Sequence, residues 1–199
     1  MSIARQLHPA ALPREVVSME AVSREVPATR QLIPALAADG SIYPIEKMDA
    51  HRRAVQHLAV SVFVFSDDEL LLQRRADSKY HCGGLWANTC CTHPHWNESD
   101  AASAVRRLRE EMGLSLALTP GAVIEYSAAV SHGLWENERV QVFHARVDRR
   151  HTVPILNPDE VSHARWASLS SIRADLVRDP GAYAPWFRIY MARWAELGV

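Results

Sequence analysis

Sulfur and imidazole groups come together in the segment Asn-Thr-Cys-Cys-Thr-His-Pro at residues 88–94. Cys91 and His93 lie two residues apart, so in an extended strand both side chains point to one face while Cys90 points to the other. A thiol beside a positive charge or a metal ion loses its proton more easily, and its pKa falls below the ordinary value of about 8.5. This spacing indicates a reactive Cys91. The alternative is that both cysteines are small core residues.

A structural zinc site is a further alternative for the cysteines. It would use Cys82, Cys90, Cys91 and His93. Their spacing does not match the C-x2-C pattern of such sites. Adjacent cysteines are also poorly placed to bind one ion together, so the sequence favours the reactive thiol.

Acidic groups repeat the two-residue spacing at Glu136 and Glu138. Two carboxylates on one face of a strand repel each other unless water or a cation lies between them. An exposed loop would explain the pair if it stood alone. Together with His57 and His93, the glutamates form a nitrogen and oxygen set that suits Zn²⁺, Mn²⁺ or Mg²⁺.

Basic side chains occur in two places that one anionic ligand could share. Arg75 and Lys79 lie on a loop after a predicted strand, and Arg107 precedes Glu111 by four residues on one flank of a predicted helix. Such groups suit a diphosphate, with Glu111 holding a bridging Mg²⁺. The alternative is a solvated basic face with an ordinary helical ion pair.

Two aromatic residues have a structural and a chemical interpretation. Trp186 is a core residue or offers its π face to a cation. Tyr126 is a buried phenol or a hydrogen-bond partner of a catalytic carboxylate. The residue type and its place at the start of a helix favour a core aromatic for Trp186 and leave both interpretations open for Tyr126.

Alternating strands and helices must position these groups, which predicts a mixed α/β fold. An edge hairpin is expected over 31–47 around Asp39-Gly40, with Asp49 as the N-cap of the polar segment that follows. Ser99 or Asp100 should cap a helix that ends at Gly113. The expected buried stripe of this helix is Ala101, Val105, Leu108 and Met112. The other expected strands are 57–65, 70–73, 85–92, 119–125, 139–147 and 163–166, and the other expected helices are 169–176 and one beginning at Pro185 with the stripe Phe187, Tyr190, Met191 and Trp194.

Composition limits the class of protein. The chain has 199 residues, 48% hydrophobic and 23% charged, with a net charge of −1. These values predict one globular domain over 29–199, preceded by a flexible tail at 1–28. The charge argues against nucleic-acid or membrane-surface binding. Three cysteines and the lack of an apolar leader predict a reducing, cytoplasmic location.

Five segments, taken in order, resemble one family. They are DAHRRAVQHLAVSVFVF, LLQRRADSKYHCGGLWANTCCTHP, ESDAASAVRRLREEMGL, ENE and PWFRIY. Together they are similar to the type I isopentenyl-diphosphate isomerases, metal-dependent members of the Nudix superfamily. The resemblance covers roughly residues 30–195. It implies a Nudix-type α/β/α sandwich with a mixed central sheet and an extra N-terminal edge hairpin.

The resemblance also implies a role for each site residue. Cys91 would be the catalytic thiol and Glu138 the opposing acid or base, with Tyr126 beside it and Trp186 facing a cationic carbon. Arg75, Lys79 and Arg107 would contact an isoprenoid diphosphate. Glu111 would bind its Mg²⁺. A second divalent ion, Mn²⁺, Zn²⁺ or Mg²⁺, would be bound by His51, His57, His93, Glu136 and Glu138.

The Nudix hydrolase signature, G-x5-E-x7-R-E-U-x-E-E-x-G-U with U an aliphatic residue, is matched only in part. Thr92 replaces its glycine and Arg107 replaces its first helical glutamate, while Glu98, Arg106, Leu108, Glu110, Glu111, Gly113 and Leu114 agree. Loss of that carboxylate weakens a multi-metal site for hydrolysis, so an isomerase is favoured over a diphosphate hydrolase. A metal-stabilised module that only binds isoprenoid diphosphates is the non-enzymatic alternative. We expect a monomer or a weak homodimer.

Overall fold

The structure is a computed structural model that describes residues 31–199. The tail expected at 1–28 lies outside the described residues, so the domain boundary at 29 stays a prediction. Within residues 31–199, none of the helices combines the length and apolar character needed to cross a membrane.

One mixed sheet contains all nine strands of the described chain. Its strands are β1 (Leu32–Leu36), β2 (Ile42–Glu46), β3 (His57–Ser66), β4 (Glu69–Arg75), β5 (Trp86–Ala87), β6 (Cys90–Thr92), β7 (Thr119–Ala129), β8 (Trp135–Arg146) and β9 (Val161–Ser168). The helices are α1 (Lys47–Arg52), α2 (Asp100–Met112), α3 (Leu169–Arg178) and α4 (Pro185–Ala192), with 3₁₀ turns at Ser131–Gly133, Pro180–Ala182 and Trp194–Glu196.

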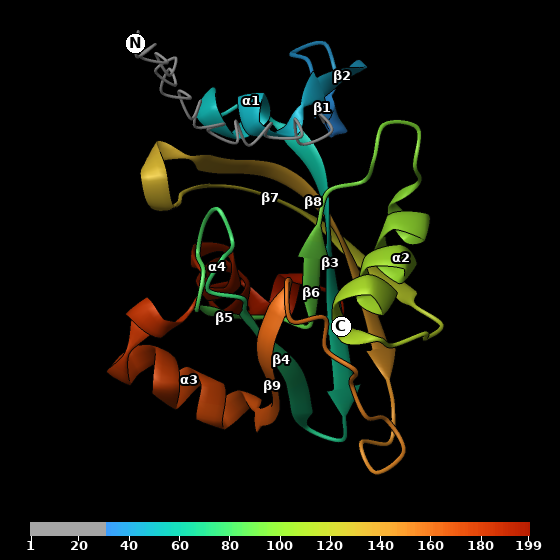
Figure 1. Cartoon of the computed structure of the whole chain (residues 1–199), viewed down its shortest axis with the longest axis vertical. Helices are drawn as coiled ribbons and strands as arrows, with labels where there is room; N and C mark the ends of the chain where they lie inside the picture. Colours follow the sequence, from blue (N-terminus) through green and yellow to red (C-terminus); the bar gives the residue numbers. More distant parts are fainter. Residues whose placement is uncertain (1–30) are drawn as a thin grey trace, which may run out of the picture.

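Strand β3 is the centre of the sheet. It pairs in parallel with β8 along nearly its whole length, from His57 opposite Glu138 to Phe65 opposite Arg146. Its other edge is shared in turn by β1, β6 and β4, all antiparallel. This arrangement brings the start of β3, the Cys-containing β6 and the acidic part of β8 side by side (Figure 1).

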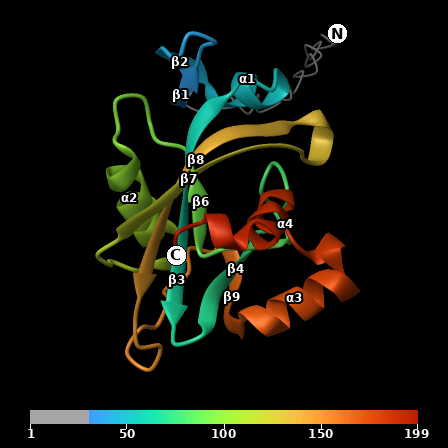
Figure 2. The same cartoon turned by 180° about the vertical axis from the view of Figure 1, so that it is seen from behind.

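Helices cover both faces of the sheet, which confirms the predicted α/β/α sandwich (Figures 1 and 2). Alternate β3 side chains supply two cores. Phe63 and Phe65 pack on the side of α3 and α4, while Val62 and Val64 pack under α2. The predicted edge hairpin is also confirmed: β1 and β2 pair antiparallel, and Gly40 in their turn has φ +82°.

Helix α2 has the predicted ends but a rotated buried face. The Ser99 hydroxyl accepts a hydrogen bond from the Ala102 N–H at 3.2 Å, and Gly113 ends the helix with φ +66°. Ala101 and Val105 are exposed, so the predicted stripe is wrong at these two positions. The buried face is Ser103, Ala104, Leu108, Glu111 and Met112, because the helix packs over β3 and β6 and turns Glu111 inward.

Several helices and strands begin or end at residues other than those predicted. Glu46, not Asp49, caps α1: its carboxylate accepts from the Asp49 N–H at 3.0 Å. Trp194 lies in a 3₁₀ turn beyond α4, and the segment 85–92 divides into β5 and β6. Strands β7 and β8 run further than expected, so the Glu136-Asn137-Glu138 segment belongs to a strand and not to an exposed loop. Long-range pairing extends these strands beyond what the local pattern indicates.

Candidate functional site

A pocket opens between β3, β6, β8 and the helices α2 and α4. It gathers most of the predicted site residues from segments far apart in the sequence. Its lining includes Arg75, Lys79, Cys91, His93, Arg107, Glu111, Tyr126, Glu136, Glu138 and Trp186. His51 and His57 do not line it and lie, fully buried, against Glu136.

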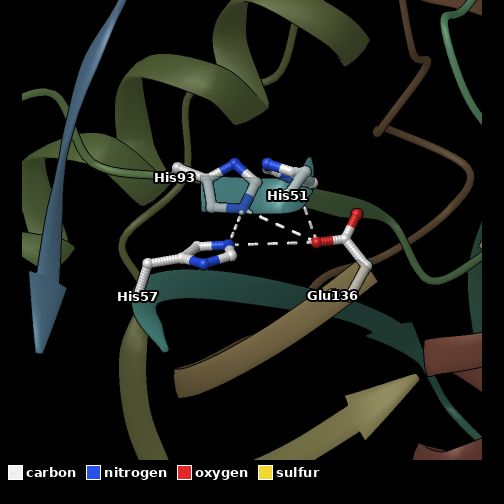
Figure 3. A group of neighbouring side chains, drawn as sticks. All are labelled: His51, His57, His93 and Glu136. Atoms are coloured by element: carbon white, nitrogen blue, oxygen red, sulfur yellow. Dashed lines mark hydrogen bonds and ion pairs between the residues drawn. The ribbon is translucent and has the colours of Figure 1, made fainter. Parts of the chain in front are cut away.

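Three histidines and a glutamate converge at one end of this pocket. His51 on α1, His57 at the start of β3, His93 after β6 and Glu136 on β8 each direct one ligand atom to a common centre (Figure 3). These atoms all lie within 4.8 Å of one another. The cluster was expected from the sequence as a divalent-metal site, and the fold brings its members together.

The hydrogen bonds around the cluster prepare it for a cation. The Nδ1 atoms of His51 and His57 lie 2.6 and 2.7 Å from the backbone carbonyls of Lys47 and Val55. A carbonyl only accepts, so each Nδ1 carries the proton and each Nε2 offers a lone pair to the centre. His51 Nε2 and Glu136 Oε2 are 3.1 Å apart, yet neither has a hydrogen-bond partner among the described residues.

The spacing of these atoms also fits a bound ion. His57 Nε2 lies 3.1 Å from His93 Nε2, which places two imidazole nitrogens closer than their lone pairs tolerate without a shared proton or cation. Neighbouring ligands about 2.1 Å from one metal ion are separated by about 3.0–3.4 Å, the range from octahedral to tetrahedral geometry. Burial lowers the pKa of His57 to about 4 and that of His93 well below its ordinary value, so both rings stay neutral, as metal binding requires.

Glu138 lies beside this cluster and is joined to Tyr126. The Tyr126 hydroxyl donates a hydrogen bond to Glu138 Oε2, and His93 Nε2 is 2.9 Å from Glu138 Oε1. Burial, followed by repulsion from Glu136, raises the pKa of Glu138 well above its usual range. Burial also acts to raise the pKa of Glu136, but its contacts with His51 and His81 outweigh this and hold the pKa well below the usual range. One carboxyl is therefore held neutral and the other charged until a cation binds.

Cys91 and Cys90 lie on opposite faces of β6, as the two-residue spacing predicts. Cys91 lines the pocket, whereas Cys90 is fully buried in the core under α2. The Cys91 thiol donates to Asn88 Oδ1 at 3.0 Å, and its sulfur lies 3.2 Å from the Ser61 hydroxyl. Because Cys90 and Cys91 face apart, the alternative of a single zinc site made from both is wrong.

The expected lowering of the Cys91 pKa is not found. Burial raises the pKa of Cys91 to about 12, and hydrogen bonds with Ser61 and Asn88 oppose this only in part. The two-residue spacing predicts an imidazole near the sulfur. The groups that contact the sulfur are instead the neutral Ser61 hydroxyl and the side-chain amide of Asn88. Cys91 is therefore a neutral thiol that carries a proton, not a thiolate.

Basic groups form another side of the pocket. Arg107 contacts Glu111 at 2.6 Å and Glu160 at 3.0 Å, and Lys79 contacts Glu160 at 2.7 Å. The guanidinium of Arg75 lies 5.3 Å from the centre of the Trp186 ring. The helical ion pair considered as an alternative does form, and it forms inside the pocket rather than on a solvated face.

This chain is similar to known proteins along most of its length. The family model described as NUDIX domain matches residues 55–187. An isopentenyl-diphosphate Delta-isomerase of Dinoroseobacter shibae is 48% identical over 84% of this chain and 94% of its own length. One from Ruegeria pomeroyi is 47% identical over 83% of this chain and 91% of its own. This chain belongs to the isopentenyl-diphosphate Delta-isomerases of the NUDIX family.

Solved structures support the fold of this family member. A Deinococcus radiodurans protein, DR0079, superposes with a TM-score of 0.58 at 17% identity, covering 77% of this chain and 91% of that one. The MutT protein of Methanosarcina mazei gives 0.56 at 20% identity, covering 70% and 93%. At such low identity the likeness concerns the fold alone.

Within this isomerase family member, the partial hydrolase signature has a structural counterpart. Glu98 pairs with Arg106 at 2.7 Å outside the pocket, and Glu110 is exposed. Among the acids of the signature, only Glu111 lines the pocket. The helix therefore presents a single carboxylate where Nudix hydrolysis would need several.

Other pocket residues were not identified from the sequence. Lys47 precedes His51 by one helical turn, and that spacing could have revealed it; burial lowers its pKa to about 8. Tyr80 and His81 belong to a loop whose sequence has no hydrophobic period, and Glu160 lies between β8 and β9. Nothing in the local pattern marks these three as pocket residues.

Proposed function

We propose that this chain interconverts isopentenyl diphosphate and dimethylallyl diphosphate by a 1,3-allylic proton shift. The observation that carries the proposal is that a partly buried, protonated thiol, Cys91, and a buried carboxyl, Glu138, line one pocket. The relatives that are 47% and 48% identical to this chain are isopentenyl-diphosphate Delta-isomerases, which supports this reaction. The substrate class is thus an isoprenoid diphosphate.

The reaction needs two proton-transfer groups. An unactivated alkene is a very weak base, so one positioned group must give a proton to C4 while the other removes a proton from C2. Cys91 and Glu138 form this pair, and they exchange roles in the reverse direction. The Tyr126 hydroxyl holds Glu138 through its hydrogen bond, and Asn88 and Ser61 hold the Cys91 sulfur.

The intermediate between the two transfers is a tertiary carbocation at C3. Trp186 is only 3% exposed and offers a π face to this charge without a nucleophilic lone pair that would trap it. Trp186 is buried and Cys91 and Tyr126 are partly buried, and together they limit the access of water that would capture the cation. The diphosphate stays intact throughout.

The remote diphosphate positions the small hydrocarbon end. Arg75, Lys79 and Arg107 supply the positive charge for its oxygens, and Glu111 would hold the Mg²⁺ that binds it. This binding energy orients the olefin between the proton-transfer groups.

A second divalent ion fits the cluster of His51, His57, His93 and Glu136, and Glu138 beside the cluster would be a further ligand. When bound, this ion supplies positive charge that lowers the pKa of Glu138 and compensates the buried lone pairs. Mn²⁺, Zn²⁺ and Mg²⁺ are the candidates, and the three imidazoles favour the first two.

An NMR assay with isopentenyl diphosphate and Mg²⁺ in D₂O tests the proposal. We expect dimethylallyl diphosphate that carries deuterium. Release of phosphate without isomer would reject the proposal and favour a Nudix-type diphosphate hydrolase. Binding without any isotope exchange would favour a module that only binds isoprenoid diphosphates.

A further inference from the structure

The loop at residues 76–85 carries a buried histidine, His81, that the proposed reaction does not use. His81 is 3% exposed, and its ring lies edge-on to Trp186, with centroids 5.8 Å apart and planes at 84°. On another side it stacks on His51 at 5.9 Å and 30°. Its backbone carbonyl accepts a hydrogen bond from Arg75 at 3.3 Å. The ring is therefore fixed between the proposed diphosphate and metal sites.

The polar contact of this ring is to a metal-cluster residue. His81 Nε2 lies 2.9 Å from Oε1 of Glu136. The other oxygen, Oε2, faces the cluster and lies 3.1 Å from His51 Nε2 and 3.9 Å from His93 Nε2. A carboxylate only accepts, so the short contact places the proton of His81 on Nε2.

The different partners of Oε1 and Oε2 determine how the carboxylate of Glu136 is oriented. The terminal torsion of a glutamate is broad, so nothing within Glu136 itself keeps one oxygen aimed at the cluster. A donor on the other oxygen removes that freedom. Partners of this kind around metal ligands typically change metal affinity or activity by about 10–100-fold when removed.

We propose that His81 is a positioning residue for the metal centre: its Nε2–H holds Oε1 of Glu136 so that Oε2 stays aimed at His51, His57 and His93. The inference rests on the metal centre of the proposed function. It does not require that the protein catalyse any reaction.

The test measures Zn²⁺ affinity of chelator-stripped protein by competition with a chelator. His81→Phe keeps a ring but loses the donor, and we expect about 10–100-fold weaker binding. His81→Gln keeps an amide N–H at a similar reach, and we expect affinity within about threefold of the unchanged chain. His163→Phe, at an exposed position on β9, is the matched control and should change nothing.

Equal weakening by His81→Phe and His81→Gln would overturn the inference, because the ring would then act through packing. Unchanged affinity in His81→Phe would also overturn it. If the unchanged chain bound no Zn²⁺, the metal centre itself would fail, and the inference with it. These outcomes separate the positioning role from the isomerase proposal, since no activity is measured.

A second measurement avoids the risk that a variant does not fold. In the unchanged chain labelled with ¹⁵N-histidine, we expect the His81 Nε2–H signal to persist when Zn²⁺ is added. Loss of that proton on Zn²⁺ binding would overturn the positioning role, because His81 would then be a ligand itself.

Discussion

Tyr126 and Glu138 stand directly opposite each other in the β7–β8 ladder, and the Tyr126 hydroxyl donates a hydrogen bond to the Glu138 carboxyl. The antiparallel register makes this contact possible, because directly paired side chains lie on the same face of the sheet. The proposed acid or base is thus fixed by strand pairing and not by a mobile loop.

Tyr126→Phe should lower kcat by about 10–100-fold, because a hydrogen bond to a charged or acidic group contributes about 1.5–3 kcal/mol. KM should change little, since the hydrogen bond of the phenol is to Glu138 and not to a basic group of the proposed diphosphate site. Steady-state kinetics of the isomerisation measure both. A rise in KM at constant kcat would instead place Tyr126 in ground-state substrate binding.

The adjacent cysteines provide a matched pair. Cys91→Ala should abolish detectable isomerisation, because it removes a proton-transfer group that typically contributes at least about 100-fold. Cys90→Ala should keep most of the activity and lower the free energy of unfolding by about 1–2 kcal/mol, since it empties a small volume of the core under α2. Activity and urea unfolding of both variants check this. Loss of turnover only in Cys90→Ala would reverse the assignment.

Glu111 and Glu110 are neighbours with different surroundings. Glu111 is buried in the pocket and accepts hydrogen bonds from the side chains of Arg107 and Gln73, whereas Glu110 is exposed. Glu111→Gln should therefore lower kcat/KM by about 100-fold or more and weaken the dependence on added Mg²⁺. Glu110→Gln should stay within about twofold. Titration of activity with Mg²⁺ distinguishes the two, and equal effects would contradict the assignment of Glu111.

The buried histidines predict how the stability of metal-free protein depends on pH. Burial lowers the pKa of folded His57 to about 4 from its ordinary value of 6.5, so the unfolded chain binds more protons between these values. Stability is then fully present above about pH 6.5 and is lost as the pH falls toward 4. His57 alone should cost about 2 kcal/mol between pH 7 and 5.

Urea unfolding in the presence of a chelator, at about pH 7, 6 and 5, measures this loss. His93, whose pKa is also lowered by burial, adds to it in the same direction. A free energy of unfolding that stayed constant from pH 7 to 5 would contradict the neutral, buried state of both rings.

The sequence predicts those parts of the site that depend on a local period. Cys91 with His93, and Glu136 with Glu138, follow from the alternation of a strand, and Ser99 and Gly113 follow from helix capping. The fold class follows from the order of the segments and from the family resemblance.

Features that depend on distant partners could not be predicted in the same way. The pairing of Tyr126 with Glu138 follows a register shift between Pro120 and Val123, which no local pattern shows. The raised pKa of Cys91 depends on burial under elements remote in the sequence. The rotated face of α2 depends on what the helix covers, since Val105 and Ala104 are both apolar and only one is buried.

The hairpin β1–β2 and helix α1 precede the residues that match the NUDIX family model, and they have a small core of their own, made of Ile33, Ala35, Ile45 and Ala50. Yet α1 contributes His51 to the metal cluster. An ion bound at that centre would therefore link β1, β2 and α1 to the part of the chain that matches the NUDIX family model. Metal binding would then increase the resistance of residues 31–54 to proteolysis, and this can be measured without an assay of turnover.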